Sequence, residues 1–400
     1  MNIGVFTIML RNGGTERVVA QLSRIWTALG HNVVFFTLEP MQECDFPYEC
    51  IAREYATSGG WKADDVEHLQ KKYALDLVIV NGGWNNDWVC PVLCQFKALH
   101  VRTAAILHHA FNNWAFSGSN IGDFDKDELL AHLDCVVCVD KMQALWWSRR
   151  HSCVAYLPNP VSFDSPSDFS RKRLSEKNHS IVWVGRANDI GKRINLAIEV
   201  FRKVRKKVPD ATMTVVGLLP KEWKCYEPGI AFTGYVPNCQ GYVQSAAVHL
   251  LTTLWEVTVP QVVLEATAMG VPTVAFDLPV LRGEEGIYLG KDIADVADMI
   301  SLVFAAPDKF DVANGRRLLE KRNEDVGKRW EELFEAFEVG DFDKYIASMS
   351  QEYKNLDEYA RLVDEIQRSE AFIVENQIPI LNKVRRWQAG WEHFKKMVRL

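Results

Sequence analysis

The sequence predicts an α/β fold with two doubly wound parallel-sheet domains and a helical extension at the carboxyl end. The chain has 400 residues, more than one hydrophobic core usually serves, so two domains are expected. Short apolar runs alternate with segments of helical periodicity in two successive series, an alternation typical of parallel sheets covered by helices. Ligands bind such sheets at the carboxyl ends of the strands, so we expect the two domains to face a cleft there.

The first series begins with a strand–helix–strand unit. An apolar strand starts at Ile3, apolar residues then recur at helical spacing between Val18 and Leu29, and Gly30 ends the helix. Extended apolar runs follow, and each is bounded by polar residues or glycine, as buried parallel strands are. These predicted strands cover 33–36, 77–80, 104–107 and 136–139. We assign residues 1–162 to an amino-terminal domain on the acceptor side.

A linker and a second series follow. Pro158-Asn159-Pro160 and the polar segment 162–180 break the pattern, as a connection between domains does. We assign residues 178–337 to a carboxyl-terminal domain and residues 338–400 to the helical extension. The predicted strands of this second domain cover 181–184, 211–216, 248–251, 271–276 and 286–289.

The composition excludes several protein classes. With 48% hydrophobic and 24% charged residues the chain is ordinary globular protein, and a formal charge of −6 argues against a nucleic-acid binder. Nine scattered cysteines fit reduced thiols and a cytoplasmic location better than a disulfide framework. Cys135 and Cys138 lie in an apolar run, so we interpret them as core residues rather than metal ligands or a redox pair. Neither a signal peptide nor a membrane span is expected.

A diphosphate site is predicted after the first strand of the second series. Gly185 and Arg186 follow that strand directly, and Lys192 comes six residues after the arginine. A nucleotide diphosphate needs cations beside it, and an Arg and a Lys from one loop can reach both phosphates. Such a pair also occurs on ordinary solvated loops, so it indicates a site only together with other features.

The segment 255–275 provides the second feature. Glu256 precedes Pro260, a helix bearing Glu265, and a Gly-Val-Pro that leads into an apolar strand. The apolar neighbours of Glu265 predict burial, and a buried carboxylate needs a partner. The vicinal hydroxyls of a ribose would suit it, because a carboxylate accepts two hydrogen bonds at once. The alternatives are a carboxylate that caps a nearby loop or pairs with a core arginine.

Several motifs, taken in order, resemble those of glycosyltransferase family 4, a group of retaining GT-B enzymes, over residues 1 to 337. The resemblance implies two Rossmann-like domains and transfer of a sugar from a UDP- or GDP-sugar to an acceptor hydroxyl, in bacterial cell-surface polysaccharide or glycoconjugate synthesis. The acceptor would be a glycan, a lipid-linked molecule or a small molecule. The matching parts are 13–19, 158–161, 185–186 together with Lys192, 234–237 and 265–272.

The resemblance also implies roles for single residues. Arg186 and Lys192 would bind the donor pyrophosphate and stabilise the leaving nucleotide diphosphate, and Glu265 would hold the ribose. Gly13 and Gly14, at the start of a helix, would let backbone N–H groups approach the phosphates or the sugar. No metal or other cofactor is expected, because the two cations supply the electrostatic stabilisation.

The spacing of the two glutamates departs from the family pattern. The family places them eight positions apart, whereas Glu256 and Glu265 are nine apart and Val257 stands at the aligned position. Either a one-residue bulge returns Glu256 to the site, where it would contact the transferred sugar, or the sugar contact has changed. We favour the bulge because loops absorb single insertions readily.

Two histidines in tandem end a strand of the first domain. His108 and His109 stand where family members often carry a histidine that meets the donor sugar or the reacting centre. We expect a functional role for at least one; the alternative is a structural one. The segment 81–84 also follows a strand and either lines the acceptor side or forms a plain turn. No carboxylate pair suits a double displacement, so the resemblance implies same-face attack with the departing phosphate oxygen as base.

The helical extension allows two interpretations. Its last part places apolar residues between Val384 and Val398 on one helical face, with lysines and arginines largely elsewhere. We favour packing of this face on the amino-terminal domain or on a second subunit, as in a homodimer. The alternative is an interfacial helix that brings the protein to the inner face of the cell membrane and suits a lipid-linked acceptor.

Two other functions are also compatible with the sequence. A non-catalytic protein that binds sugar nucleotides, or a scaffold, would fit the irregular glutamate spacing. A sugar-nucleotide epimerase shares the GT-B plan but lacks the ordered set of motifs.

Overall fold

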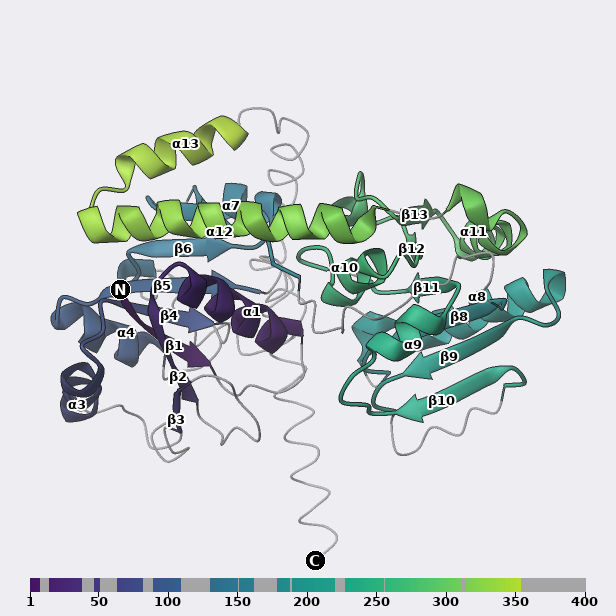
Figure 1. Cartoon of the computed structure of the whole chain (residues 1–400), viewed down its shortest axis with the longest axis horizontal. Helices are drawn as coiled ribbons and strands as arrows, with labels where there is room; N and C mark the ends of the chain where they lie inside the picture. The colour runs from purple at the N-terminus through teal and green to yellow at the C-terminus, as the bar shows by residue number, and fades with distance from the viewer. Residues whose placement is uncertain are drawn as a thin grey trace, which may run out of the picture. The chain divides into compact units, whose positions relative to one another are not determined.

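The computed structural model describes residues 1–7, 14–37, 47–50, 63–81, 89–108, 130–149, 151–161, 178–187, 189–219, 227–254, 256–310, 312 and 314–353. These residues form two parallel-sheet α/β domains, which confirms the predicted fold class (Figure 1). Within the described part of the chain, no helix has the length and apolarity needed to cross a membrane.

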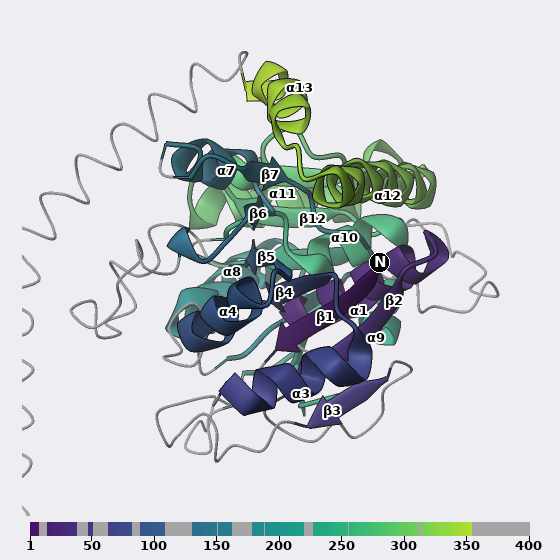
Figure 2. The ribbon, with the colours of Figure 1, turned by 90° about the vertical axis from the view of Figure 1, so that its left-hand side faces the viewer.

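The first sheet has the strand order β3-β2-β1-β4-β5-β6-β7. Its central strands are buried on both faces, as the apolar runs predict. The strands are β1 (Asn2–Thr7), β2 (Asn32–Thr37), β3 (Tyr48–Cys50), β4 (Leu77–Asn81), β5 (Arg102–Leu107), β6 (Cys135–Cys138) and β7 (Val154–Tyr156). The helices are α1 (Gly14–Ala28), α3 (Ala63–Tyr73), α4 (Val89–Ala98) and α7 (Lys141–Trp147), and Figure 2 shows α3 and α4 together beside this sheet.

Two details of the first sheet follow from local sequence. Gly30 has φ +90°, a left-handed conformation that suits glycine, and it ends the turn after α1. Cys135 and Cys138 are fully buried in β6, which confirms their interpretation as core residues. Burial raises the pKa of both thiols well above the usual range.

The second sheet has the strand order β10-β9-β8-β11-β12-β13. The chain runs outward from β8 through β9 to β10, then returns to the other side of β8 with β11. The direction of winding therefore reverses between β8 and β11, and the loops after these two strands flank the switch point, where α/β sheets bind ligands. The strands are β8 (Ser180–Val184), β9 (Thr212–Val216), β10 (Ile230–Gly234), β11 (Val248–Leu251), β12 (Thr273–Phe276) and β13 (Ile287–Gly290).

Helices cover both faces of the second sheet. One face packs against α8 (Ile194–Lys207) and α11 (Ile293–Ala305) around Trp183 and Phe201. The other face packs against α9 (Gln240–Ser245) and α10 (Gln261–Ala268), with Val182 and Ala266 in the shared core. Short 3₁₀ turns complete the domain: η2 (Ile190–Lys192), η3 (Pro279–Leu281) and η4 (Pro307–Lys309).

Beyond α11 the described chain continues with the helices α12 and α13. The long helix α12 (Gly315–Val339) packs on α1, where the rings of Trp330 and Phe334 lie 4.7 Å and 5.9 Å from that of Trp26. The next helix, α13 (Asp343–Tyr353), contacts β7. The apolar face predicted between residues 384 and 398 lies outside the described residues, so its partner remains a prediction.

The packing divides the chain into two compact units. One combines Met1–Ile51 with Leu157–Glu335, and the other combines Ala52–Tyr156 with the segment that begins at Ala336. The domain boundaries predicted from the sequence follow the two sheets instead and stay predictions.

Candidate functional site

The candidate donor site lies in the first compact unit, at the switch point of the second sheet. The loop after β8 carries Gly185, Arg186 and Lys192, and the loop after β11 carries Glu256. Because β8 and β11 are hydrogen-bonded neighbours, these two loops leave the sheet side by side.

Two glycines bring the ends of β8 and β9 together. Gly217 has φ +135°, and a Cβ on it would lie 1.9 Å from the carbonyl oxygen of Gly185. The N–H of Gly185 donates to the carbonyl of Val216 at 3.0 Å. The close approach requires glycine at position 217, and it sets the direction in which the chain leaves β8 toward Arg186.

Arg186 presents its guanidinium to solvent beside one carboxylate. The side chain is 73% exposed, and its Nη2 donates to Asp189 Oδ2 at 2.8 Å. The other carboxylate oxygen, Asp189 Oδ1, accepts the N–H of Gly191 at 2.9 Å and caps the η2 turn. A guanidinium has five N–H donors, so donors remain for phosphate oxygens.

The turn that carries Lys192 is fixed to the end of β11 through its backbone. The N–H of Leu254 donates to the carbonyl of Gly191 at 2.8 Å, and the Thr252 hydroxyl donates to the carbonyl of Lys192 at 2.8 Å. Thr252 in turn accepts the indole N–H of Trp183, a buried core residue, at 2.9 Å. The position of Lys192 therefore depends on the core of the sheet.

Lys192 and Glu256 form an ion pair. Lys192 Nζ lies 2.5 Å from Glu256 Oε1, and the side chains are 27% and 15% exposed. The structure thus brings Glu256 to Lys192, the lysine predicted to bind the diphosphate, although the glutamate spacing departs from the family pattern. Its predicted contact with the transferred sugar stays a prediction.

Glu265 is buried in α10, and an arginine accompanies it. Its side chain is 1% exposed, and Arg17 Nη2 of α1 donates to its Oε1. Both residues belong to the first compact unit. Pairing with an arginine is one of the alternatives expected from the sequence, and it meets the need of a buried carboxylate for a charged partner. The predicted ribose contact would have to share or replace this pair.

Cys239 adds a neutral group to the surroundings of Glu265. Burial raises the pKa of the Cys239 thiol, the Glu265 carboxylate raises it further, and Arg17 lowers it. The thiol therefore stays protonated near neutral pH and adds no second negative charge beside Glu265.

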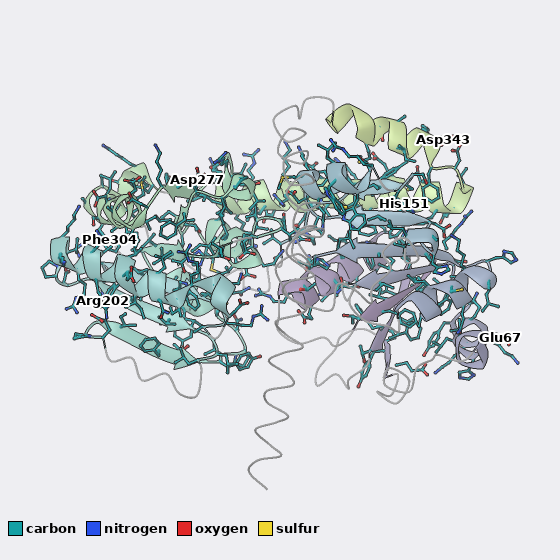
Figure 3. All side chains as sticks on the ribbon, turned by 180° about the vertical axis from the view of Figure 1, so that it is seen from behind. Glu67, His151, Arg202, Asp277, Phe304 and Asp343 are labelled. Carbon is teal, nitrogen blue, oxygen red and sulfur yellow. The ribbon has the colours of Figure 1, made fainter. Side chains whose placement is uncertain are left out.

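Asp277, labelled in Figure 3, follows β12 at the same edge of the sheet. Arg282 donates to both of its oxygens, from Nε at 2.8 Å and from Nη2 at 2.9 Å. These hydrogen bonds hold the pKa of Asp277 below its usual value. The pair fixes the η3 turn, and the sequence motifs gave no indication of it.

Two of the other predicted residues, Gly14 and His108, lie on elements beside or within the first sheet. Gly14 begins α1, and outside its own helix no described residue has an atom within 4 Å of the position that a Cβ would take there. The imidazole N–H at His108 Nε2 donates to Asn81 Oδ1 at 2.7 Å, so the ends of β5 and β4 are linked. Gly13 and His109 lie outside the described residues.

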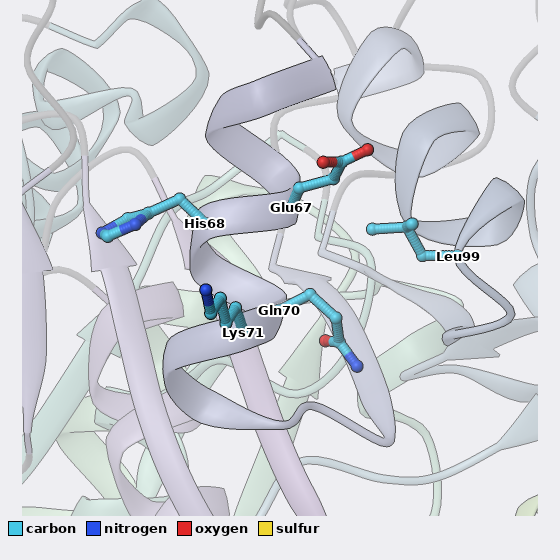
Figure 4. A pocket seen from close by; sticks show the side chains of 5 residues that line it. All are labelled: Glu67, His68, Gln70, Lys71 and Leu99. Carbon is cyan, nitrogen blue, oxygen red and sulfur yellow. The ribbon is translucent and has the colours of Figure 1, made fainter.

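A hollow elsewhere on the surface contains none of these residues. It lies over α3 and is lined by Glu67, His68, Gln70, Lys71 and Leu99. Figure 4 shows Glu67 and Gln70 extending toward the side of Leu99, and His68 and Lys71 extending from the other side of the helix. Four of these five residues come from a single helix. Among the described residues no second element contributes a polar group to this hollow, and we assign it no function.

The structure also reveals contacts that the sequence motifs did not predict. Asp189, Thr252 and Arg17 contact the predicted donor residues or the backbone that carries them. An acidic residue three positions after Arg186 and a threonine just after β11 were visible in the sequence, but their contacts depend on turn geometry.

Comparisons with known proteins indicate the class of protein to which this chain is similar. Residues 178–305 match the family model for glycosyl transferases group 1. A curated protein of Haemophilus influenzae, described as an uncharacterized glycosyltransferase, is 23% identical over 300 residues, which are 69% of this chain and 80% of that protein.

Solved structures with a similar fold include two nucleotide complexes. Anabaena HepE with UDP and glucose has a TM-score of 0.64 at 13% identity, over 84% of this chain and all of that one. The pneumococcal O-GlcNAc transferase GtfA with UDP and GlcNAc has a TM-score of 0.61 at 12% identity, over 84% of this chain and 99% of that one. The family model and the curated relative support a glycosyltransferase, and the solved structures support the GT-B fold.

Proposed function

We propose that this glycosyltransferase is a retaining enzyme that transfers a sugar from a UDP- or GDP-sugar to an acceptor hydroxyl, in cell-surface polysaccharide or glycoconjugate synthesis. The observation that carries the proposal is the pairing of two cations from the β8 loop with carboxylates at the switch point. Arg186 and Lys192 give that loop the charge to bind a diphosphate. In this proposal Glu256, which is paired with Lys192, contacts the sugar attached to that diphosphate.

Each residue has a proposed role in this reaction. Arg186 and Lys192 neutralise the diphosphate and stabilise it as it departs, a role that makes a metal unnecessary. Glu256, which accepts a hydrogen bond from Lys192, also has oxygen lone pairs for sugar hydroxyls. No second carboxylate is positioned as acid or nucleophile in the proposal, so the departing phosphate oxygen takes the proton of the acceptor hydroxyl.

UDP is the first nucleotide to test. HepE and GtfA were solved with UDP, and this chain shares their fold, which supports trying UDP before GDP. A ligand that binds only the folded protein raises its melting temperature, and saturation at about 100 times Kd stabilises by about 2.7 kcal/mol. We expect UDP or GDP to raise the melting temperature by roughly 5–10 °C.

The matched variants are Arg186→Ala and Arg202→Ala. Arg202 is also exposed and paired with a carboxylate, Glu227, but it lies on α8 away from the loop. We expect the first variant to lose the thermal shift and the second to keep it. A full shift in Arg186→Ala would refute the assigned phosphate site.

Turnover separates an enzyme from a binding protein. We expect the wild-type protein to release UDP or GDP from a sugar nucleotide when an acceptor is present. A protein that binds the nucleotide but releases none from any sugar nucleotide would be a non-catalytic binding protein, and the proposal would fail.

A further inference from the structure

We propose that Asp189 is a positioning residue that sets the orientation of the Arg186 guanidinium toward the donor diphosphate; the inference rests on the function proposed above. Asp189 belongs to none of the motifs that mark the donor site. Its carboxylate nevertheless contacts both the guanidinium and the turn that carries Lys192.

The two oxygens of Asp189 have separate partners. Oδ2 accepts from Arg186 Nη2 at 2.8 Å, and Oδ1 accepts from the N–H of Gly191 at 2.9 Å. One carboxylate therefore joins a side chain to a backbone turn. In the described part of the chain, Asp189 is the one residue whose side chain hydrogen-bonds Arg186.

The backbone of Asp189 is also hydrogen-bonded within the same loop. The N–H of Asp189 donates to the carbonyl of Arg186 at 3.0 Å, and the carbonyl of Asp189 accepts the N–H of Lys192 at 3.0 Å. The η2 turn is itself fixed to the end of β11 by Leu254 and Thr252. Asp189 thus holds the exposed guanidinium at a position defined by the sheet.

Arg186 needs such a partner because its side chain is long and 73% exposed. An arginine without a partner samples many rotamers, and binding would have to fix one of them. Its planar guanidinium recognises phosphate through two parallel hydrogen bonds only when it is oriented correctly. Asp189 occupies one N–H and leaves others for the phosphate oxygens.

The orientation of Arg186 by Asp189 favours the reaction, whereas the negative charge of Asp189 weakens binding of the diphosphate. A carboxylate near a diphosphate repels it, so Asp189→Asn removes a repulsion and also loosens Arg186. The amide oxygen of asparagine can still accept from Gly191, so the η2 turn keeps its cap. We expect kcat to fall about tenfold while the KM for the donor stays within about threefold of wild type or decreases.

A double-mutant cycle with Arg186→Lys tests whether Asp189 acts through Arg186. A lysine is a point charge without a plane to orient, so Asp189→Asn should cost less than about threefold in kcat in the Arg186→Lys background. Asp298→Asn is the control, because Asp298 pairs with Lys207 between α11 and α8. We expect wild-type kinetics and an unchanged melting temperature for that control.

The outcomes separate this inference from the proposed function. If the wild-type protein neither binds a nucleotide diphosphate nor releases one from a sugar nucleotide, the proposed function fails. If the wild type is active and Asp189→Asn keeps the wild-type kcat, or costs the same in both backgrounds, the positioning role is wrong. A lowered melting temperature with kcat and KM changed together would show a structural role instead.

Discussion

Each proposed donor residue with a charge has an oppositely charged partner within the protein. Arg186 is paired with Asp189, Lys192 with Glu256, and Glu265 with Arg17. A diphosphate that arrives with negative charge must share or replace these carboxylates. The charges of these paired residues therefore cancel before the donor binds. Which ligand is selected depends on which of these carboxylates a diphosphate can replace as the partner of its arginine or lysine.

Glu256→Gln tests whether the diphosphate replaces Glu256 as the partner of Lys192. The amide removes the charge that neutralises Lys192, so we expect UDP binding to stay the same or tighten. Transfer should slow by about 10- to 100-fold if the carboxylate contacts the sugar, because a hydrogen bond to a charged group is lost. Titration calorimetry with UDP and initial rates with the sugar nucleotide measure the two effects.

The control for Glu256→Gln is Glu320→Gln, which alters an exposed partner of Arg316 on α12. It should leave binding and rate unchanged. Suppose Glu256→Gln weakens UDP binding and slows transfer by no more than the loss of affinity. Glu256 would then position Lys192 instead of contacting the sugar.

His249 gives the protein a specific sensitivity to acid. It is fully buried in β11, its Nδ1 lies 3.1 Å from Thr273 Oγ1, and burial lowers its pKa from 6.5 to about 3. The unfolded chain binds a proton here below pH 6.5, whereas the folded protein does not until about pH 3. Folding stability should therefore fall as pH decreases through this window, by about 2 kcal/mol between pH 6.5 and 5.

His249→Gln tests this by removing the titrating group. Its free energy of unfolding, measured by urea denaturation, should depend less on pH between 6.5 and 5 than that of the wild type. His68→Gln changes an exposed histidine of α3 and should keep the wild-type dependence. Equal pH dependence in wild type and His249→Gln would contradict the assignment.

Sequence motifs predicted the charged residues of the proposed site but not the contacts that hold those residues in place. Glu265 was expected to be buried with a partner, yet Arg17 lies 248 positions away and only the folded chain brings them together. The contacts of Asp189 and Thr252 arise from the path of a turn. A sequence shows that a capping residue is present and does not show which groups it reaches.

At the scale of elements, the loop after β8 depends on its neighbour β9. The glycine at position 217 lets the two strand ends touch at the carbonyl of Gly185. That carbonyl lies immediately before Arg186. A change in the packing of β8 against β9 is therefore expected to shift Arg186 in the proposed donor site.

Gly217→Ala tests this dependence. The added methyl group would overlap the Gly185 carbonyl, and φ +135° is unfavourable for alanine, so we expect a loss of about 2 kcal/mol or more in stability together with weaker UDP binding. Gly241→Ala is the control, because outside its own helix no described residue lies within 4 Å of its Cβ position in α9. It should be neutral or stabilising by up to about 1 kcal/mol. Unchanged stability and UDP affinity in Gly217→Ala would contradict the tight contact.

The strands that sequence patterns missed share one property. β3 and β7 are the two edges of the first sheet, and β10 is an edge of the second. β3 and β7 have three residues each, and β10 is largely half-exposed. An edge strand needs no continuous apolar run, so its pattern resembles that of a loop, whereas the central strands were predicted closely.

At the scale of the whole molecule, the linker is hydrogen-bonded to helices that come much later in the chain. Asn323 of α12 accepts from the N–H of Val161 and donates to its carbonyl, both at 2.8 Å. Arg322 donates to the carbonyl of Asn159, and Gln261 of α10 donates to that of Pro160. The Pro-Asn-Pro segment is thus an ordered part of the first compact unit.

Asn323→Ala should destabilise this unit. It leaves the N–H and the carbonyl of buried Val161 without their partners, at a cost of about 2 kcal/mol. Glu324→Ala changes the next, exposed residue of α12 and should have little effect. Calorimetry of the two variants measures the difference, and equal melting temperatures would contradict a stabilising role for the linker contacts.

The architecture of the molecule was predictable because its signals are repeated along the chain. Two series of apolar runs, separated by a proline-rich break, predict two sheets, and this prediction does not depend on any single residue. The way α12 packs on Trp26 was not predictable, because it joins an aromatic pair about 300 positions apart.

The attachment of the η2 turn has a consequence for how the protein can evolve. Thr252 and Leu254 hold the turn by the carbonyl oxygens of Lys192 and Gly191, and every amino acid has a carbonyl. A mutation at position 192 therefore changes the charge offered to the substrate and leaves these attachments in place. At position 192 the charge of the side chain is therefore independent of the backbone hydrogen bonds that hold the η2 turn. Substitutions there can change what the loop binds while the structure of the loop is kept.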